Sequence, residues 1–393
     1  MVMISRPQSG PRRRRGGRGV RGSTPPSAPG WRAAAASPRI RGGSSVKRRT
    51  MGGTETGFCG VSMAESYRNA AHAVDGRACM ACARMRGQPE GYVVSSKLSR
   101  IEIPASKGVF SCLAGGPPLG QAPLIHLAHA TGMNAQTYAP LLERLAARYT
   151  VRAVDLRGHG LTTVPAEPSR LRSWERYVHD LVPILEQWGQ PAILVGHSMG
   201  GAVSGELAAV HPTLAAGLLM IDPAVLPRAA VPAMAVARAT GLNRRFPIAE
   251  QAAKRRAVWP SREMLVAGYR GRGAFKTWGA GFLEAYIDGG TRPTADGAVA
   301  LTCAPAWEAK TFSTISLMFW RRMPRLRCPV SVLYAEHHST LRDEGARTFR
   351  KLQPAATVEK VAGSSHFIPM ESPDLVIAAI DALAARARGQ KAA

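Results

Sequence analysis

Residues 193–203 read ILVGHSMGGAV, an apolar run that ends in a serine set between glycines. The apolar run predicts a buried β-strand, and the small residues that follow predict the start of a helix. Gly196 and Gly200 stand two residues on either side of Ser198, and glycine lets a chain turn sharply without a steric clash. This strand, turn and helix form the pattern of a nucleophile elbow, in which the serine hydroxyl projects from the end of the strand.

Short β-rich runs alternate with helical patterns around this turn, from about residue 99 onward. We expect one helix over residues 138–149 and another with apolar positions between Trp174 and Leu185. Strands are expected at residues 122–130, 150–156, 191–196, 214–222, 328–336 and 356–363. Such alternation is typical of βαβ units, so we expect an α/β fold whose mostly parallel central sheet carries helices on both faces.

The chain of 393 residues has a formal net charge of +26, and much of this charge lies near the N-terminus. Residues 1–50 contain 13 Lys or Arg and no Asp or Glu. We expect residues 1–96 to be a disordered extension rich in Arg, Gly, Pro and Ala, and residues 97–388 to be the folded domain. The extension could be an RNA-binding tail or a transit peptide, but its Pro and Gly content and its scarcity of aromatic residues favour an extension without function. Nucleic acid is therefore not expected as a required partner.

Two further classes of protein are disfavoured by the sequence. No stretch reaches the roughly 18 consecutive apolar residues of a membrane span, and no apolar segment follows the N-terminal arginines. Among six scattered cysteines only Cys79 and Cys82 form a CxxC pair, without the second pair that a zinc site needs. We expect a soluble cytoplasmic protein with no metal and no organic cofactor.

Four motifs, in this order along the chain, give residues 97–388 a resemblance to the α/β-hydrolase superfamily, specifically to its lid-bearing serine hydrolases. The motifs are HLAHATGMN (126–134), DLRGHG (155–160), GHSMGG (196–201) and GSSHFIPMESPD (363–374). The resemblance implies Ser198 as nucleophile and His366 as general base. A serine hydroxyl is a weak nucleophile until an imidazole removes its proton, so this pair makes chemical sense.

The resemblance also implies an oxyanion hole formed by the backbone N–H groups of Met199 and Thr131. The family usually has His-Gly where this chain has His129-Ala130, so Ala130 remains the alternative donor. The amide of any residue can serve, because the backbone is what donates. His129 and Asp155 are expected to brace their loops rather than to react.

The acid of the triad departs from the commonest family pattern. That pattern places an aspartate in the loop after the strand at residues 328–336, and none stands at the usual place here. Some branches take the acid from the end of the preceding strand, where Asp222 follows an apolar run. We therefore predict Asp222 as the acid, with Glu336 as the alternative and Asp343 third.

About a hundred residues separate the strands at 214–222 and 328–336, far more than an ordinary connection. By resemblance, residues 224–326 are a helical lid inserted after strand six. The aromatic side chains of this segment suggest a pocket for an apolar acyl or leaving group. Its basic residues are expected to form a solvated face, and they include Arg244, Arg245, Lys254, Arg255 and Arg256.

These patterns predict a serine hydrolase that cleaves carboxylic ester, thioester or lactone bonds of small apolar substrates through an acyl-enzyme. A carbon-carbon bond hydrolase, a perhydrolase and an acyltransferase remain alternatives, because they share the triad and only the pocket decides between them. The alternative outside enzymes is an inactive binding module with a basic, nucleic-acid-binding tail. A small apolar ester or lactone is the one partner that the motifs require.

Overall fold

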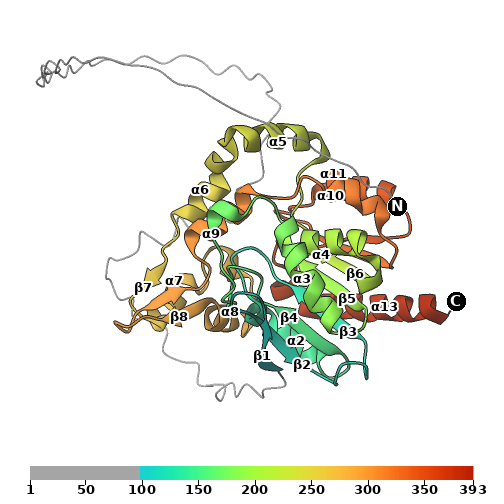
Figure 1. The fold of residues 1–393 in the computed structure, drawn as a ribbon, viewed down its shortest axis with the longest axis horizontal. Helices are drawn as coiled ribbons and strands as arrows, with labels where there is room; N and C mark the ends of the chain where they lie inside the picture. The colour runs from blue at the N-terminus through green and yellow to red at the C-terminus, as the bar shows by residue number, and fades with distance from the viewer. Residues whose placement is uncertain (1–97, 393) are drawn as a thin grey trace, which may run out of the picture. The chain divides into compact units, whose positions relative to one another are not determined.

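The computed structural model describes residues 98–392, with side chains up to residue 389. Eight strands form the central sheet in the order β1-β2-β4-β3-β5-β6-β10-β11 (Figure 1). Their bounds are β1 Leu98–Pro104, β2 Val109–Gly115, β3 Leu124–Ala128, β4 Thr150–Val154, β5 Ala192–His197, β6 Ala215–Ile221, β10 Val330–Ala335 and β11 Thr357–Val361. β2 is antiparallel to β1 and to β4, and the other neighbouring strands run parallel. The expected mostly parallel sheet is confirmed.

Helices cover both faces of the sheet because side chains alternate along each strand. Along β3, Leu124 joins one hydrophobic cluster with α3, α4 and α11, whereas Ile125 and Leu127 join a second cluster with α2 and α13. The helices outside the insertion are α2 Ala139–Leu145, α3 Glu175–Gln187, α4 Met199–Val210, α11 Arg342–Leu352, α12 Ile368–Glu371 and α13 Pro373–Ala392. Strands buried on both faces must be apolar throughout, which explains the unbroken apolar run that leads into the elbow.

The six predicted strands are present within two residues of their predicted ends. The predicted helix at residues 138–149 is shorter, because α2 ends at Leu145 and a turn leads directly into β4. The resemblance, which places the lid after strand six, implies two strands before residue 122, but the sequence patterns did not locate them; they are β1 and β2, which extend the sheet at the edge beyond β4.

The connection between β6 and β10 is an insertion with its own small sheet. Three short antiparallel strands pair there in the order β7-β9-β8, which the sequence did not predict. The insertion contains α5 Val231–Thr240, α6 Pro247–Ala253, β7 Val258–Trp259, α7 Arg262–Tyr269, α8 Phe282–Gly290, β8 Thr291–Pro293, β9 Val299–Leu301, α9 Pro305–Ser313 and α10 Phe319–Arg322. In Figure 1, α5, α6 and α7 lie outside the central sheet, above it and to its left. The insertion is therefore mainly helical and follows the sixth strand.

Within residues 98–392, no helix is both long enough and apolar enough to cross a membrane. The same part of the chain holds no group of three or more His, Cys, Asp or Glu side chains that could bind a metal ion. The predictions for the N-terminal extension and for Cys79 and Cys82 fall outside the described residues.

Candidate active site

Ser198 occupies the turn between β5 and α4 in a strained backbone conformation. Its φ is 56° and its ψ is −117°, and such a conformation costs a residue with a side chain about 1–3 kcal/mol. Its N–H donates to Ile221 O at 2.9 Å, and its carbonyl accepts from Ala202 N–H at 3.2 Å and from Ala224 N–H at 3.0 Å. These bonds to α4 and to the segment around the end of β6 hold the turn in place.

The two glycines of the elbow have no room for a side chain. A Cβ on Gly196 would lie 2.2 Å from the carbonyl oxygen of Gly200. A Cβ on Gly200 would lie 2.0 Å from the carbonyl oxygen of Ala128, at the end of β3. The glycines therefore let β5, α4 and β3 approach closely enough to put Ser198 beside the loop that follows β3.

His366 lies in the loop after β11, buried beside the elbow. Its ring centroid is 5.0 Å from that of His197, the residue before Ser198. His366 Nδ1 is 2.5 Å from Asp222 Oδ2, and Asp222 itself is fully buried at the end of β6. An imidazole whose Nδ1–H donates to a carboxylate keeps Nε2 unprotonated, which is the tautomer that can accept a proton.

The surroundings of Asp222 hold it as a carboxylate. Burial alone raises its pKa, but the hydrogen bond and charge of His366, followed by the bonds from Ser339 and Ala335, outweigh burial and leave the pKa below its usual value. Ser339 Oγ donates to Oδ1 at 2.5 Å and Thr340 N–H donates to Oδ2 at 2.9 Å. Ser339 and Thr340 thus anchor Asp222 from the loop in which the commonest family pattern carries the acid.

The other two candidate carboxylates are engaged elsewhere. Glu336 Oε2 accepts from Gly363 N–H at 2.8 Å. Asp343 accepts from the Tyr334 hydroxyl at 3.0 Å and pairs with Lys360 Nζ. Within the described residues, neither hydrogen-bonds His366, and so the geometry favours Asp222.

The two candidate oxyanion donors differ in what their amides already bind. Ala130 N–H donates to the Tyr138 hydroxyl at 3.2 Å. In the part of the chain that the structure describes, neither Thr131 N–H nor Met199 N–H donates to a protein acceptor. Thr131 Oγ1 lies 3.4 Å from Met199 Sδ, so these two residues are neighbours. The geometry therefore favours Thr131 over Ala130 as the partner of Met199.

Sequence reasoning gave no role to Tyr138 or His197, which link three loops of the site. The Tyr138 hydroxyl is 2.7 Å from His197 Nδ1, and His197 Nε2 is 2.8 Å from the carbonyl oxygen of His366. Because a carbonyl only accepts, Nε2–H of His197 donates and Nδ1 accepts from Tyr138. Burial, then the charge of His366, lowers the pKa of His197 to about 3, so the ring is neutral. The sequence held a signal for both, since His197 lies in the GHSMGG motif and Tyr138 begins the predicted helix at residues 138–149.

His129 and Asp155 brace the loops beside the site. His129 Nε2 accepts from Leu156 N–H at 2.9 Å. Asp155 accepts from Ala135 N–H at 2.7 Å and pairs with Arg100 at 2.8 Å. These contacts tie the loop after β3 to the loop after β4, as expected for supporting residues.

The insertion contacts three loops of the site. On α9, Glu308 and Trp307 lie against the glycines of two loops: a Cβ on Gly132 would meet Glu308 Oε1 at 2.3 Å, and one on Gly158 would meet Trp307 Nε1 at 2.2 Å. The ring of Trp278, between α7 and α8, lies 5.6 Å from the ring of Phe367, the residue after His366. The insertion therefore covers the turn after β3, the DLRGHG loop and the His366 loop.

One residue of the expected solvated basic face is buried instead. Arg255 pairs with Glu308 at 3.0 Å, and both side chains are almost completely inaccessible. Arg255 also bonds the hydroxyls of Tyr269 and Tyr286. The prediction for Arg255 is wrong because its partners come from α7, α8 and α9, which sequence spacing cannot bring together.

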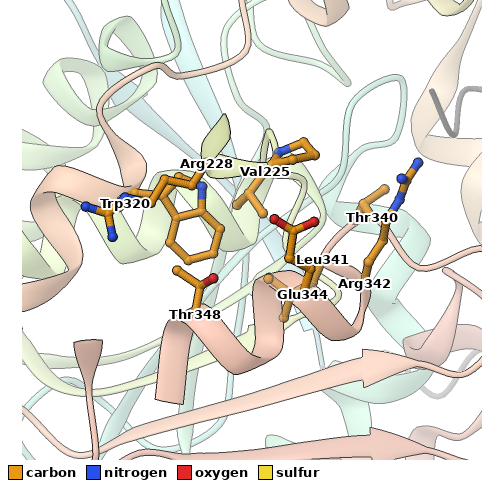
Figure 2. A pocket seen from close by; sticks show the side chains of 10 residues that line it. Val225, Arg228, Trp320, Thr340, Leu341, Arg342, Glu344 and Thr348 are labelled. Atoms are coloured by element: carbon orange, nitrogen blue, oxygen red, sulfur yellow. The ribbon is translucent and has the colours of Figure 1, made fainter. Parts of the chain in front are cut away.

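A small cavity is lined in part by Thr340, one of the residues that hydrogen-bond Asp222. It is lined by Val225, Trp320 and residues of α11 and the loop before it, including Thr340 (Figure 2). Its volume is about 10 Å³, which suits at most a single water molecule. This cavity is therefore too small to receive a substrate.

The mostly parallel sheet and the strand-serine-helix elbow together define the class of α/β-hydrolases. Residues 127–379 match the model of the alpha/beta hydrolase family, and the chain belongs to this family.

Relatives within this family include hydrolases with stated substrates. The 2-(acetamidomethylene)succinate hydrolase of Mesorhizobium japonicum is 26% identical over 262 residues, which are 66% of this chain and 87% of that protein. The pimeloyl-[acyl-carrier protein] methyl ester esterase of Chromobacterium violaceum is 36% identical over 103 residues, which are 26% of this chain and 38% of that protein. The crystal structure of an E-2-(acetamidomethylene)succinate hydrolase matches with a TM-score of 0.59 at 23% identity, covering 73% of this chain and 98% of that chain. That structural similarity supports the fold alone.

Proposed function

We propose that this protein is a serine hydrolase that cleaves carboxylic ester, thioester or lactone bonds of small apolar substrates through an acyl-enzyme on Ser198. The observation that carries the proposal is the 2.5 Å contact between His366 Nδ1 and Asp222 Oδ2 beside the elbow serine. A buried carboxylate that orients a histidine next to a strained serine is the arrangement needed to activate a hydroxyl.

In the proposed reaction, His366 Nε2 takes the hydroxyl proton as Ser198 Oγ attacks the carbonyl carbon of the substrate. The negative charge that develops on the carbonyl oxygen is stabilised by the N–H groups of Met199 and Thr131. His366 then gives its proton to the leaving alcohol or thiol, and an acyl-serine remains. Water attacks this ester by the same route, which releases the acid and restores Ser198. No metal or organic cofactor takes part in these steps.

The aromatic side chains of the insertion support an apolar substrate. Tyr269 stacks on Phe275 with ring centroids 4.8 Å apart, and Phe275 packs edge-on against Trp278 at 4.7 Å. Trp278 in turn lies against Phe367, beside His366. An aromatic cluster that begins next to the general base favours an apolar acyl or leaving group.

Labelling with a fluorophosphonate, followed by turnover of a substrate panel, tests the proposal. We expect wild-type protein to take up one fluorophosphonate and Ser198→Ala to take up none. We expect aryl esters of short to medium acyl length to be hydrolysed faster than a vinylogous diketone.

Failure of wild-type protein to react with the fluorophosphonate would favour the inactive binding module. A carbon-carbon substrate that is hydrolysed faster than every ester by orders of magnitude would instead establish the carbon-carbon bond hydrolase. Formation of a peracid from hydrogen peroxide faster than hydrolysis would favour the perhydrolase. Acyl transfer to another acceptor faster than hydrolysis would favour the acyltransferase.

A further inference from the structure

The loop that carries the proposed oxyanion donor Thr131 packs against a buried carboxylate of the insertion. Glu308 on α9 leaves no room for a side chain on Gly132, where a Cβ would lie 2.3 Å from Oε1 and 2.9 Å from the carboxyl carbon. Gly132 directly follows Thr131, and the Cα atoms of consecutive residues are about 3.8 Å apart. The Glu308 carboxylate therefore lies close to the proposed oxyanion hole.

A negative charge at this place opposes the proposed reaction unless a cation balances it. An oxyanion hole directs donors at a charge that develops in the transition state, and a nearby carboxylate repels that charge more strongly in a protein interior than in water. Arg255 Nη1 lies 3.0 Å from Glu308 Oε2, and the two side chains are 3% and 2% exposed. Burial, then the charge of Glu308, raises the pKa of the nearby Cys303 thiol, so this group is neutral. Arg255 therefore supplies the positive charge beside Glu308.

The Arg255 guanidinium is itself fixed by two other helices. Its Nη2 donates to the Tyr269 hydroxyl of α7 at 3.2 Å and to the Tyr286 hydroxyl of α8. The backbone carbonyl of Tyr286 accepts from Asn134 Nδ2 at 3.0 Å, which gives the insertion a second contact with the loop after β3. The ion pair thus connects α7, α8 and α9 around residues 130–134.

We propose that Glu308 and Arg255 are positioning residues for the oxyanion hole. Glu308 holds the loop of Thr131 in place, and Arg255 cancels the charge of Glu308 so that negative charge can develop beside it. This inference rests on the proposed hydrolase function and gives the insertion a role in the transition state. It also separates the two partners: loss of the cation should slow the reaction, whereas loss of the carboxylate charge should not.

The test measures kcat and KM of an aryl ester at equal folded fraction. Arg255→Gln leaves the Glu308 charge unbalanced, so we expect kcat to fall about 10- to 100-fold while KM stays within about threefold. Glu308→Gln keeps the size of the side chain against Gly132 and removes the charge, so kcat should equal or exceed that of wild type. The double variant Arg255→Gln/Glu308→Gln should return to within about threefold of wild type.

Arg322→Gln is the matched control. Arg322 Nη1 lies 2.5 Å from Glu206 Oε2, and Glu206 is also buried. Its loss exposes no oxyanion donor to an unbalanced charge, because Glu206 is eight residues along α4 from Ser198, or about 12 Å. We expect this variant to lose unfolding free energy, as any broken buried ion pair does, and to keep kcat within about threefold.

The outcomes separate this inference from the function on which it rests. Wild-type protein that hydrolyses no ester and takes up no fluorophosphonate would overturn both. With an active wild type, a kcat of Arg255→Gln within threefold of wild type, or an equal loss in Arg322→Gln, would overturn the inference alone. A tenfold fall of kcat in Glu308→Gln would also overturn it, and this result does not require Arg255→Gln to fold.

Discussion

Replacing Asp222 by asparagine is the sharpest test of the site, because both carboxylate oxygens already accept from donors. Oδ2 accepts from His366 Nδ1–H and Thr340 N–H, and Oδ1 accepts from Ala335 N–H and Ser339 Oγ. An amide has one acceptor oxygen, so its NH₂ group must face a backbone N–H in either orientation. Ala335 N–H is buried, whereas Thr340 is partly exposed and can bind water instead. We therefore expect the NH₂ group to face His366.

An NH₂ group in that position reverses the imidazole tautomer. His366 Nδ1 would then accept from the introduced amide, and the proton would move to Nε2, where it blocks uptake of the proton of Ser198. We expect kcat to fall by roughly three to four orders of magnitude, or about 4–5.5 kcal/mol in activation free energy. The free energy of unfolding should fall by only about 1–3 kcal/mol, the cost of one backbone donor left without its acceptor.

The assay is turnover of an aryl ester at equal folded fraction, with circular dichroism and urea unfolding on the same samples. Glu336→Gln is the matched control: it makes the same chemical change, and within the described residues Glu336 Oε2 accepts one hydrogen bond, from Gly363 N–H, and lies 3.8 Å from His337 Nε2. We expect this control to remain within about threefold of wild type. Folded Asp222→Asn protein with more than a tenth of the wild-type activity, or a collapse of activity in Glu336→Gln, would refute the assignment of Asp222.

Two further predictions concern the buried hydrogen bonds around the site. Tyr138→Phe leaves Ala130 N–H and His197 Nδ1 without a partner, so kcat should fall about 10- to 100-fold with little change in KM; a rise in KM alone would contradict a positioning role. The free energy of unfolding should fall as the pH drops from about 6.5 toward 4, because four buried histidines bind protons in the unfolded chain before they do so in the folded one. Each of these imidazoles lowers the free energy of unfolding by about 1.4 kcal/mol per pH unit. Urea unfolding at several pH values checks this, and His126→Leu should reduce the slope by one proton; a flat profile would contradict it. Burial lowers the pKa of four histidines, to about 4 for His126 and His129 and to about 3 for His159 and His197.

The sequence by itself determined the features that depend on neighbours along the chain. Gly196 and Gly200 predict the turn that carries Ser198, because an apolar run followed by a serine between two glycines is a pattern of neighbouring residues. His366 could be proposed because it follows a strand within a motif of the family. The alternation of apolar runs with helical patterns predicted a sheet of mostly parallel strands, since a strand buried on both faces must be apolar throughout.

Only the tertiary structure supplied the contacts that favour one residue where the sequence left alternatives open. Asp222 and His366 are 144 positions apart, and they meet because β6, β10 and β11 run parallel, so the segments that follow β6 and β11 lie at the same edge of the sheet. Ala130 and Thr131 are adjacent in sequence. The Tyr138 hydroxyl accepts a hydrogen bond from Ala130 N–H and not from Thr131 N–H. Arg255 was expected to be solvated like its basic neighbours in sequence, but it is buried and pairs with Glu308 of another helix. In each case the deciding contact joins elements distant in sequence, so it depends on how the elements pack and not on local pattern.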